Sequence, residues 1–466
     1  MIVHKFGGTS LGTAERILSV ADIVGSSRGE QPVVVVSAIG GATDRLIAGA
    51  RAAALGDEAT CTEAQGWLGK THHRMVDDLL SSSSECEELH EVVDKELDRL
   101  EQFLRSMAVL GELTSRGHDA VACFGEALSS AIVAATFRSR GIPAQAVHAK
   151  SLIVTDDQFG AAAPQMAATR AQIQAMIPPL VCRDIIPIIT GYVGATPDGI
   201  PTTLGRSGSD FSAAIVAACL DSTELRIWTD VDGILTADPN VVPSARVLRE
   251  LSYAEATRLA RFGAEVLHPR TIGPIIEQSI PLRIMNSFNP RDAGTRIVEL
   301  PNEHRSLWPA IVSATGLQLL RLRDHGSSWQ LRSATNALVR LDEAGIAVRM
   351  FSQSFSEQGI NLVVSEQDGA HSARLLTQIL GGVDSPYHVD TMEQVATVSA
   401  IGLARNGTEG IASSAFAALG KHKVRVVAVA QAAAEDSVTF CIPAAEADET
   451  VRFLHRELGM EEREAD

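Results

Sequence analysis

The sequence is short of positive charge. Its 466 residues include 40 Lys and Arg against 57 Asp and Glu, which gives a formal net charge of −17 at pH 7. Nucleic acids and anionic membranes bind basic surfaces, so this balance argues against either of them as the main partner. Phosphate chemistry on such a protein requires a local pocket built from a few cations and backbone N–H groups.

Other features are scarce too. The six cysteines are scattered without a C-x-x-C pair, which argues against a disulfide framework or a zinc site. No two glycines stand two positions apart, so a dinucleotide-binding G-x-G-x-x-G fingerprint is excluded. The first residues lack a long apolar segment, and the apolar stretch around 178–189 is interrupted by Arg183 and Asp184. We therefore expect neither a secretory signal nor a membrane span, but a cytoplasmic protein.

Residues 1 to about 300 alternate short apolar runs with helical periods. Strands are expected at 2–6, 33–36, 144–148, 185–190 and 225–229, each followed by turn residues and then a helix. This alternation is typical of an α/β fold in which helices cover both faces of a mostly parallel sheet.

The stretch from about 59 to 111 reads as an inserted helical hairpin without chemistry of its own. His72-His73 and His90-Glu91 show no familiar metal-ligand spacing, so both pairs are interpreted as solvated helix surface. Gly69-Lys70-Thr71 imitates the end of a P-loop, but neither the earlier glycine nor the preceding strand is there.

Residues 301–310 break the pattern and are interpreted as a linker, beyond which the sequence repeats at an offset of 78 residues. Gln353 aligns with Gln431, and Ala337 and Leu341 align with Ala415 and Leu419. Each copy is expected to form a helix, a strand, a polar loop and a second strand. The pattern leaves two interpretations open: a duplicated structural module, or a paired ligand-sensing module.

Four segments before residue 300 could carry chemistry. Lys5-Phe6-Gly7-Gly8 follows a strand, and its glycines let backbone amides approach an anion, although an ordinary glycine turn explains it as well. The loop 202–210 precedes an apolar helix, where Arg206 could hold a carboxylate or phosphate. The alternative for that loop is that Ser209 or Asp210 merely caps the helix.

The other two segments carry acids. Thr229-Asp230 ends a strand, where ligands of parallel sheets collect. Glu126 is expected in the first turn of a helix over 127–138, stabilised there by the helix dipole or used to recognise an ammonium group.

Together these motifs resemble those of the aspartate kinases, in the same order and over nearly the whole chain. The resemblance rests on Lys5-Phe6-Gly7-Gly8-Thr9, 205–210, 228–233 and 262–269, with further matches at Ser37, Thr43, Asn286, Asn289-Pro290 and Gly294-Thr295. It implies a three-layer αβα amino-acid-kinase domain over 1–300. It also implies two ferredoxin-like βαββαβ (ACT) modules over 311–390 and 391–445, the first completed by 446–466.

The resemblance further implies ATP-dependent phosphorylation of the side-chain carboxylate of L-aspartate, with Mg²⁺ on the nucleotide. This reaction opens the pathway to lysine, threonine and methionine. Catalysis would rest on Lys5, Arg206 and Asp210. The implied substrate contacts are Ser37, Thr43, Glu126, Arg206, Ser207, Gly208 and Ser209. The implied nucleotide contacts are Lys5, Phe6, Gly7, Gly8, Thr229, Asp230, Leu235, Asn240, Glu265 and Val266.

Three of those positions depart from the family pattern, because Leu235, Asn240 and Glu265 stand where tyrosine, arginine and lysine are usual. These departures favour one alternative, a catalytically weak amino-acid sensor. The other alternative is a kinase of another small amino acid on the same fold. Gln353 and Gln431 match effector-binding glutamines of threonine-sensitive relatives, so threonine or lysine is the expected inhibitor. The resemblance also implies a homodimer or larger homo-oligomer through the ACT modules. Because the sequence ends soon after the second repeat, we expect no fused homoserine dehydrogenase of the kind found in some relatives.

Overall fold

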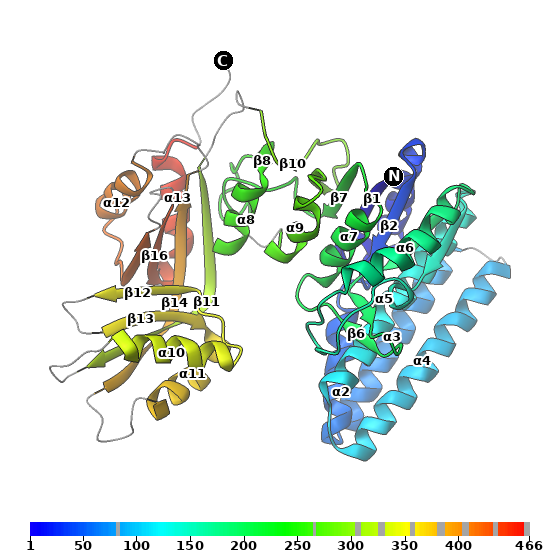
Figure 1. Cartoon of the computed structure of the whole chain (residues 1–466), viewed down its shortest axis with the longest axis horizontal. Coiled ribbons are helices and arrows are strands. Elements are labelled where there is room, and N and C mark those ends of the chain that lie inside the picture. The colour runs from blue at the N-terminus through cyan, green and yellow to red at the C-terminus, as the bar shows by residue number, and fades with distance from the viewer. Residues whose placement is uncertain are drawn as a thin grey trace. The chain divides into compact units, whose positions relative to one another are not determined.

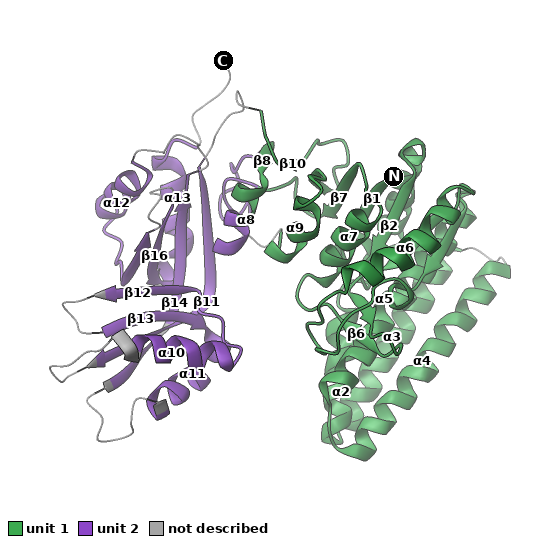
Figure 2. Cartoon of the chain, in the orientation of Figure 1, with its two compact units in different colours: residues 1–234, 249–257, 266–303 green, residues 235–248, 258–265, 304–466 purple. Residues whose placement is uncertain are grey.

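A computed structural model describes residues 1–80, 84–263, 267–302, 309–324, 331–354, 359–379, 387–402, 410–431 and 437–460. The chain divides into two compact units (Figure 2). Unit 1 comprises 1–234, 249–257 and 266–303, and unit 2 comprises 235–248, 258–265 and 304–466. The chain therefore passes between the units several times before residue 300, whereas a single boundary there was expected from the sequence.

Unit 1 is built on an eight-stranded sheet in the order β3-β4-β2-β1-β7-β9-β10-β8 (Figure 1). Its strands are β1 (Ile2–Phe6), β2 (Pro32–Val36), β3 (Ala144–Val147), β4 (Ile186–Thr190), β7 (Glu224–Thr229), β8 (Glu250–Ser252), β9 (Leu282–Asn286) and β10 (Thr295–Val298). All neighbouring pairs are parallel except β9 with β10. The five strands expected from the sequence and the mostly parallel sheet are confirmed.

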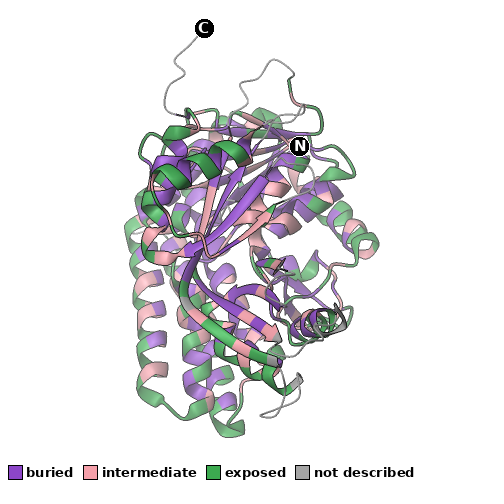
Figure 3. Ribbon diagram, turned by 90° about the vertical axis from the view of Figure 1, so that its left-hand side faces the viewer, coloured by how far each residue is buried: buried purple, intermediate pink, exposed green. Residues whose placement is uncertain are grey.

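The central strands are apolar because helices cover both faces of the sheet. All residues of β1, β2 and β4 are buried. Figure 3, coloured by burial, shows buried and exposed residues alternating along the helices, which turn one side toward a core. Helix α1 (Ala14–Ser26) packs in one core with β1, β2 and α5 (Ser115–Ser139), while α7 (Gly208–Cys219) packs against β1 and β7. The remaining helices of this part are α2 (Ala42–Leu55), α3 (Glu58–Leu79), α4 (Ser84–Leu110), α6 (Met166–Val181), α8 (Tyr253–Phe262) and α9 (Pro269–Ile276), and a small hairpin joins β5 (Val193–Ala195) to β6 (Pro201–Thr203).

Two expectations about helices have different outcomes. The helical hairpin is confirmed as α3 and α4, which pack on each other and on α2. Helix α5, however, begins at Ser115 behind the N-cap Thr114, so Glu126 lies in its middle rather than in its first turn. The expectation of an N-terminal acid is therefore wrong, because the apolar run continues back to residue 120. Helix α5 is long and apolar enough to cross a membrane, but its apolar window is 78% buried within the unit, as in a core helix.

Unit 2 contains a six-stranded antiparallel sheet in the order β12-β13-β11-β14-β16-β15. Its elements are β11 (Ala310–Asp324), α10 (Leu331–Glu343), β12 (Met350–Ser354), β13 (Gly359–Ser365), α11 (Glu366–Ile379), β14 (Tyr387–Ile401), α12 (Ile411–Lys421), β15 (Ala428–Gln431), β16 (Ser437–Pro443) and α13 (Ala447–Glu457). The long strands β11 and β14 pair along most of their length, with bulges between Ala314 and Leu319. Two helix-backed modules thus share one sheet.

The two modules have separate cores. Helices α10 and α11 pack on β13 and on the C-terminal half of β11. Helices α12 and α13 pack on β16 and on the C-terminal half of β14. The expectation that 446–466 completes the first module is therefore wrong for α13, since Val451 and Leu454 are buried in the core of the second module. Ile311 of β11 belongs to that same core. The N-terminal part of β11, the first strand of unit 2, therefore contributes to the second module.

The 78-residue repeat is confirmed in three dimensions. Gln353 faces Ile360 across β12 and β13, and Gln431 faces Val438 across β15 and β16, so both glutamines occupy the same register position. The aligned helix residues Ala337, Leu341, Ala415 and Leu419 are all buried.

Candidate functional site

A cavity of about 470 Å³ opens in unit 1 where β1 and β2 end. Because parallel strands end at the same edge of a sheet, the loops that follow them meet there. Ten sequence-predicted residues line it: Lys5, Gly8, Ser37, Thr43, Glu126, Arg206, Ser207, Gly208, Ser209 and Asp210. All the proposed catalytic and substrate residues are thus gathered in one place.

The cavity holds an ion pair at its base. Nζ of Lys5 lies 2.6 Å from Oδ1 of Asp210, and both side chains are largely withdrawn from solvent. Lys5 belongs to β1 and Asp210 to the first turn of α7, so the pair joins the sheet to the helix. A lysine held by one short contact keeps two further N–H donors available to an anion.

The N-terminus of α7 faces the same cavity. Helix α7 starts at Gly208, behind Ser207 in a left-handed conformation with φ +55°, and no side chain caps it. The alternative in which Ser209 or Asp210 merely caps the helix is therefore wrong. A Cβ on Gly208 would stand 2.4 Å from Cδ2 of Tyr192, so only glycine fits there. The free N–H groups and the helix dipole favour an anion at this end.

Two glycine loops form the opposite wall. A Cβ on Gly8 would lie 2.9 Å from the carbonyl oxygen of Ala38, and one on Gly40 would lie 3.3 Å from that of Gly8. The backbones of the loops after β1 and β2 therefore approach each other closely, and Gly8, Gly40 and Gly41 line the cavity without side chains that would fill it.

Glu126 projects from the middle of α5 and is buried, with 3% of its surface exposed. Burial raises its pKa to about 8, although hydrogen bonds from backbone N–H groups act in the opposite direction. Its Oε2 atom has no hydrogen-bond partner among the described residues. A buried carboxylate oxygen without a donor is costly, so the cavity is prepared for a ligand that brings a cation or donor there. Arg206, by contrast, is exposed at the cavity mouth.

Sequence analysis missed a supporting acid two helical turns before Glu126. Asp119 is fully buried and accepts hydrogen bonds from the backbone N–H groups of Gly160 and Thr203 and from the Thr203 hydroxyl, all at 2.8 Å. It fixes Gly160, which lines the cavity, and β6, which precedes the Arg206 loop. The seven-residue spacing from Glu126 was the available signal, since it places both acids on one face of α5. The cavity lining also includes Tyr192 and Asp44, which the motifs did not mark.

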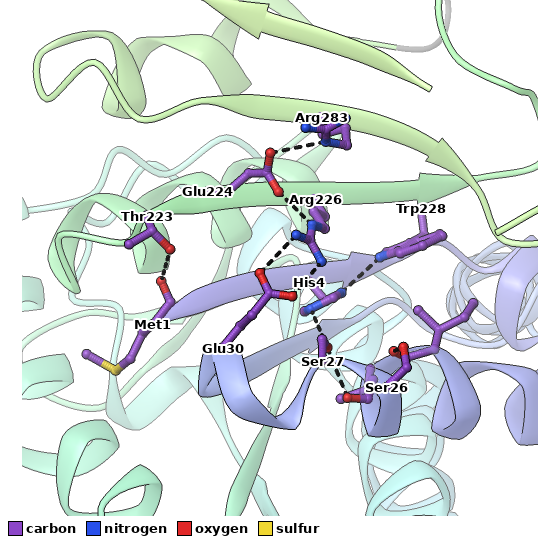
Figure 4. A network of polar contacts seen from close by, with 12 residues as sticks. Met1, His4, Ser26, Ser27, Glu30, Thr223, Glu224, Arg226, Trp228 and Arg283 are labelled. Atoms are coloured by element: carbon purple, nitrogen blue, oxygen red, sulfur yellow. Dashed lines mark hydrogen bonds and ion pairs between the residues drawn. The ribbon is translucent and has the colours of Figure 1, made fainter. Parts of the chain in front are cut away.

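The polar centre of the sheet holds β1 and β7 together under the site (Figure 4). Nε1–H of Trp228 donates to Nδ1 of His4 at 3.0 Å, and Nε2 of His4 lies 3.2 Å from the Ser27 hydroxyl, which donates to the Val24 carbonyl. Nδ1 must therefore be the unprotonated nitrogen of His4. Burial and the nearby Arg226 lower its pKa to about 3, which keeps the ring neutral.

The residues predicted to touch the nucleotide are less concentrated. Thr229 and Asp230 lie at the end of β7 but do not line the cavity; the N–H of Gly7 donates to the Trp228 carbonyl, so the two loops start side by side. Oδ1 of Asp232 accepts hydrogen bonds from the side-chain amides of Asn286 and Asn289, which shows why those residues accompany the Asp230–Gly233 turn. Phe6 is buried in the core beneath the loop.

Leu235 and Asn240 belong to unit 2. Leu235 bridges to Val247, and Asn240 donates its backbone N–H to Asp238. Their neighbours Ala237 and Val242 pack into the core of the second ACT-like module. Glu265 and Val266 lie outside the described residues. The contacts of these four positions with a nucleotide stay predictions.

Comparison with known families and structures identifies this arrangement. Residues 1–286 match the amino acid kinase family and residues 398–458 match an ACT domain. The chain therefore belongs to the amino acid kinase family.

Its relatives are more specific. Aspartokinase 1, chloroplastic, of Arabidopsis thaliana is 32% identical over 97% of this chain and 79% of that protein. The bifunctional aspartokinase/homoserine dehydrogenase 1 of the same plant is also 32% identical over 97% of this chain, but the chain spans only 50% of its length. Among solved structures, Escherichia coli aspartokinase III in complex with aspartate and ADP superposes with a TM-score of 0.83 at 27% identity, covering 98% of this chain and 99% of that one.

Proposed function

We propose that this chain catalyses ATP-dependent phosphorylation of the side-chain carboxylate of L-aspartate, giving 4-phospho-L-aspartate. The observation that carries the proposal is the convergence of Lys5, Glu126, Arg206 and Asp210 on one cavity in unit 1. The aspartate and ADP bound by Escherichia coli aspartokinase III, whose fold and chain length this protein shares, support the same assignment.

The cavity offers separate partners for the two ends of an α-amino acid. Arg206 at the mouth can hold the α-carboxylate through two parallel N–H groups. The unpartnered Oε2 of Glu126 can accept a hydrogen bond from the α-ammonium. An N-acylated amino acid lacks that charge, so this pairing favours a free amino acid. The side-chain carboxylate of aspartate is then directed toward Lys5.

Phosphoryl transfer needs positioning and charge neutralisation more than covalent assistance. Lys5, the backbone of Gly8 and the N-terminus of α7 line the cavity and provide that positive field. Mg²⁺ would arrive with ATP and offset further phosphate charge, which matters for a protein of net charge −17. The attacking carboxylate is already ionised at neutral pH, so no general base is required.

The test is ADP release from MgATP by the purified chain, with aspartate, glutamate or N-acetylglutamate as acceptor. We expect saturable release with aspartate and at most a few per cent of that rate with the other two. A preference for glutamate or N-acetylglutamate would assign the cavity to another amino acid, and release independent of any acceptor would indicate simple ATP hydrolysis.

We also propose that unit 2 binds an amino-acid effector at the module carrying Gln353. Both glutamines occupy equivalent strand positions, but Gln353 has a serine on each side, at Ser352 and Ser354, whereas Gln431 follows Ala430 and ends its strand. Only the first copy thus keeps polar residues on both sides of its glutamine in the sequence. Escherichia coli aspartokinase III has been solved with lysine and aspartate, which supports an amino-acid effector in this family.

Threonine is our preferred effector, with lysine as the second candidate. The rate with aspartate should fall in millimolar threonine, Gln353→Ala should abolish that inhibition, and Gln431→Ala should leave at least half of it. Equal threonine inhibition of Gln353→Ala and Gln431→Ala would contradict the difference between the two modules. If neither threonine nor lysine changes the rate of the original chain, the repeat has only a structural role.

We further propose that the modules of unit 2 pair between copies of the chain. Val339, Phe351 and Phe416 are large apolar side chains that stay exposed on this unit. Light scattering at micromolar concentration should give at least twice the mass of one chain, and Phe351→Ser should shift the protein toward the monomer. A monomer at all concentrations would contradict this pairing.

A further inference from the structure

A second group of polar side chains lies away from the cavity, between α3 and α4. His73 and Asp77 come from α3, and Cys86, His90 and Asp94 come from α4. Within each helix these residues are four apart, so each set forms one stripe on a helix face. Because the two helices run side by side, the stripes face each other (Figure 1). The expectation of solvated surface is therefore wrong for the histidines, since His73 and His90 face each other and His72 is fully buried, whereas Glu91 is exposed as expected.

The two histidine rings form the middle of a chain of contacts. Nδ1 of His73 lies 2.6 Å from Nδ1 of His90, and the rings stack with centroids 4.9 Å apart. The outer nitrogens face acids: Nε2 of His73 is 2.9 Å from Asp94, and Nε2 of His90 is 2.9 Å from Asp77. The order is thus Asp94, His73, His90, Asp77.

These contacts need more protons than the rings carry. Each of the three links requires one N–H proton, but two neutral imidazoles supply only two. If both outer nitrogens donate to the aspartates, two bare nitrogen lone pairs meet at 2.6 Å, which is repulsive. The cluster is therefore complete only when one more cation, a proton or a metal ion, takes part.

A cysteine stands next to the link that a metal ion could replace. The ligand atoms of Asp77, Cys86 and His90 all lie within 4.8 Å of one another. Cys86 is 9% exposed and forms no disulfide, and the exposed Asp77 opens this side of the group to solvent. A thiolate, an imidazole nitrogen and a carboxylate oxygen form a donor set that Zn²⁺ accepts in tetrahedral sites, at about 2.0–2.3 Å from each atom.

We propose that Asp77, Cys86 and His90 bind a zinc ion between α3 and α4, with water as the fourth ligand. A metal on Nε2 of His90 replaces the missing proton. The His90 Nδ1–H then donates to Nδ1 of His73, and the His73 Nε2–H donates to Asp94, so every contact has its proton. His73 and Asp94 thereby orient the His90 ligand, as a second shell commonly does at zinc sites.

Binding has two consequences for the protein. The thiol of Cys86 loses its proton to solvent as the Zn–S bond forms, with no change of oxidation state. The ion also ties the C-terminal part of α3 to the N-terminal part of α4, so it stabilises the folded hairpin by binding to it in preference to the unfolded chain. The site is independent of the proposed kinase cavity.

The experiment uses the full chain, stripped of metal with a chelator. Equilibrium dialysis against Zn²⁺ should show one ion bound per chain, and saturating Zn²⁺ should raise the midpoint of thermal unfolding. Co²⁺ in place of Zn²⁺ should give visible bands of a tetrahedral ion and a near-ultraviolet thiolate charge-transfer band. Cys86→Ser should remove the thiolate band, and His90→Gln should weaken Zn²⁺ binding at least about tenfold.

The matched control is Cys182→Ser, which changes an exposed cysteine elsewhere in unit 1 and should alter neither binding nor spectrum. His73→Gln should weaken Zn²⁺ binding by about tenfold while leaving the thiolate band in place, because His73 acts through His90. The proposal is overturned if the stripped chain binds no stoichiometric Zn²⁺. It is equally overturned if Co²⁺ binds without a thiolate band, or if Cys86→Ser and His90→Gln bind as tightly as the original chain.

Discussion

The cavity and the α3–α4 cluster are both polar groups in unit 1, but they are assembled differently. The cavity collects loops that follow strands, and each loop carries its residues next to one another in the sequence, as at 5–8 and 205–210. The α3–α4 cluster takes single residues from two helices, four positions apart. A loop motif can be recognised in the sequence because its residues are contiguous. Residues spaced along a helix can be recognised as a site only when the partner helix is known.

The two groups also differ in how their charges are satisfied. In the cavity, Oε2 of Glu126 has no donor among the described residues, and the N-terminus of α7 has no side-chain cap. In the cluster, each ring nitrogen of His73 and His90 already faces a neighbour. The cavity therefore has polar groups left for a ligand, whereas the cluster needs one additional proton or cation. Substitution of residues that line the cavity should affect turnover. Substitution of the buried residues that support it, such as Asp119 and His4, should affect the free energy of unfolding.

The largest effect is expected at Lys5. Lys5→Met removes the buried cation of the cavity and should lower kcat with aspartate and MgATP by about 10³-fold, the scale on which a single transition-state contact acts. The exposed Lys70→Met on α3 is the matched control and should keep the original rate. If Lys5→Met retains more than a tenth of the rate while circular dichroism shows an intact fold, Lys5 does not contact the transferring phosphoryl group.

Asp119 tests the framework of the cavity. Asp119→Ala leaves the N–H groups of Gly160 and Thr203 and the Thr203 hydroxyl without their acceptor, so we expect a loss of about 3 kcal/mol in the free energy of unfolding. Asp119→Asn should retain most of that stability, because its carbonyl oxygen can take the backbone donors while the hydroxyl accepts from its amide. Chemical denaturation measures both, and equal losses would show that the charge of Asp119, not its geometry, matters.

Glu126 tests how the substrate ammonium is recognised. Its pKa is about 8 in the empty cavity because of burial, so at pH 7 it is mostly protonated. An ammonium ligand favours the carboxylate, so aspartate binding at pH 7 should release close to one proton, and binding at pH 9, where Glu126 is mostly ionised and the substrate is still mostly an ammonium, should release about none.

Calorimetry in buffers of different ionisation enthalpy counts those protons. Glu126→Gln should release none and should raise the KM for aspartate by about tenfold or more, as expected when a charged hydrogen bond is lost. The exposed Glu63→Gln is the control. Proton release that persists in Glu126→Gln would assign the ammonium to another acid.

The smallest effect near neutral pH is expected at His4, beneath the site. Its pKa is about 3 in the folded chain and near 6.5 when unfolded, so the unfolded chain binds more protons between these values. Stability should therefore fall by about 1.4 kcal/mol per pH unit from this group as the pH drops below 6.5. His4→Gln should flatten that part of the profile, and the exposed His371→Gln should not. An unchanged slope in His4→Gln would place the acid sensitivity elsewhere.

The sequence alone predicts the fold of unit 1 well because its strands are apolar throughout and bounded by turn residues, as at Val33–Val36. The loops of the cavity are predictable for a related reason, since a Cβ would meet the Ala38 carbonyl oxygen at Gly8 and the Tyr192 ring at Gly208, which favours glycine at both positions. Local chemistry determines both.

What the sequence does not reveal depends on tertiary partners. Glu126 looks like a first-turn acid until α5 is known to begin at Ser115. The placement of α13 in the second module depends on which core receives Val451 and Leu454, and both modules present apolar strands of similar composition. The segment 235–248 carries a nucleotide motif by resemblance, yet Ala237 and Val242 pack with the regulatory module. The start of a helix and the core that receives a segment are decided by tertiary packing, so a short motif does not reveal them.

The central claim is that this cavity makes an acyl phosphate from aspartate. The most direct measurement is hydroxamate formation, in which hydroxylamine traps the acyl phosphate made by the full chain from aspartate and MgATP. We predict a signal that saturates with aspartate, requires MgATP and falls by about 10³-fold in Lys5→Met. The absence of aspartate-dependent hydroxamate from folded protein, with or without threonine or lysine, would contradict it.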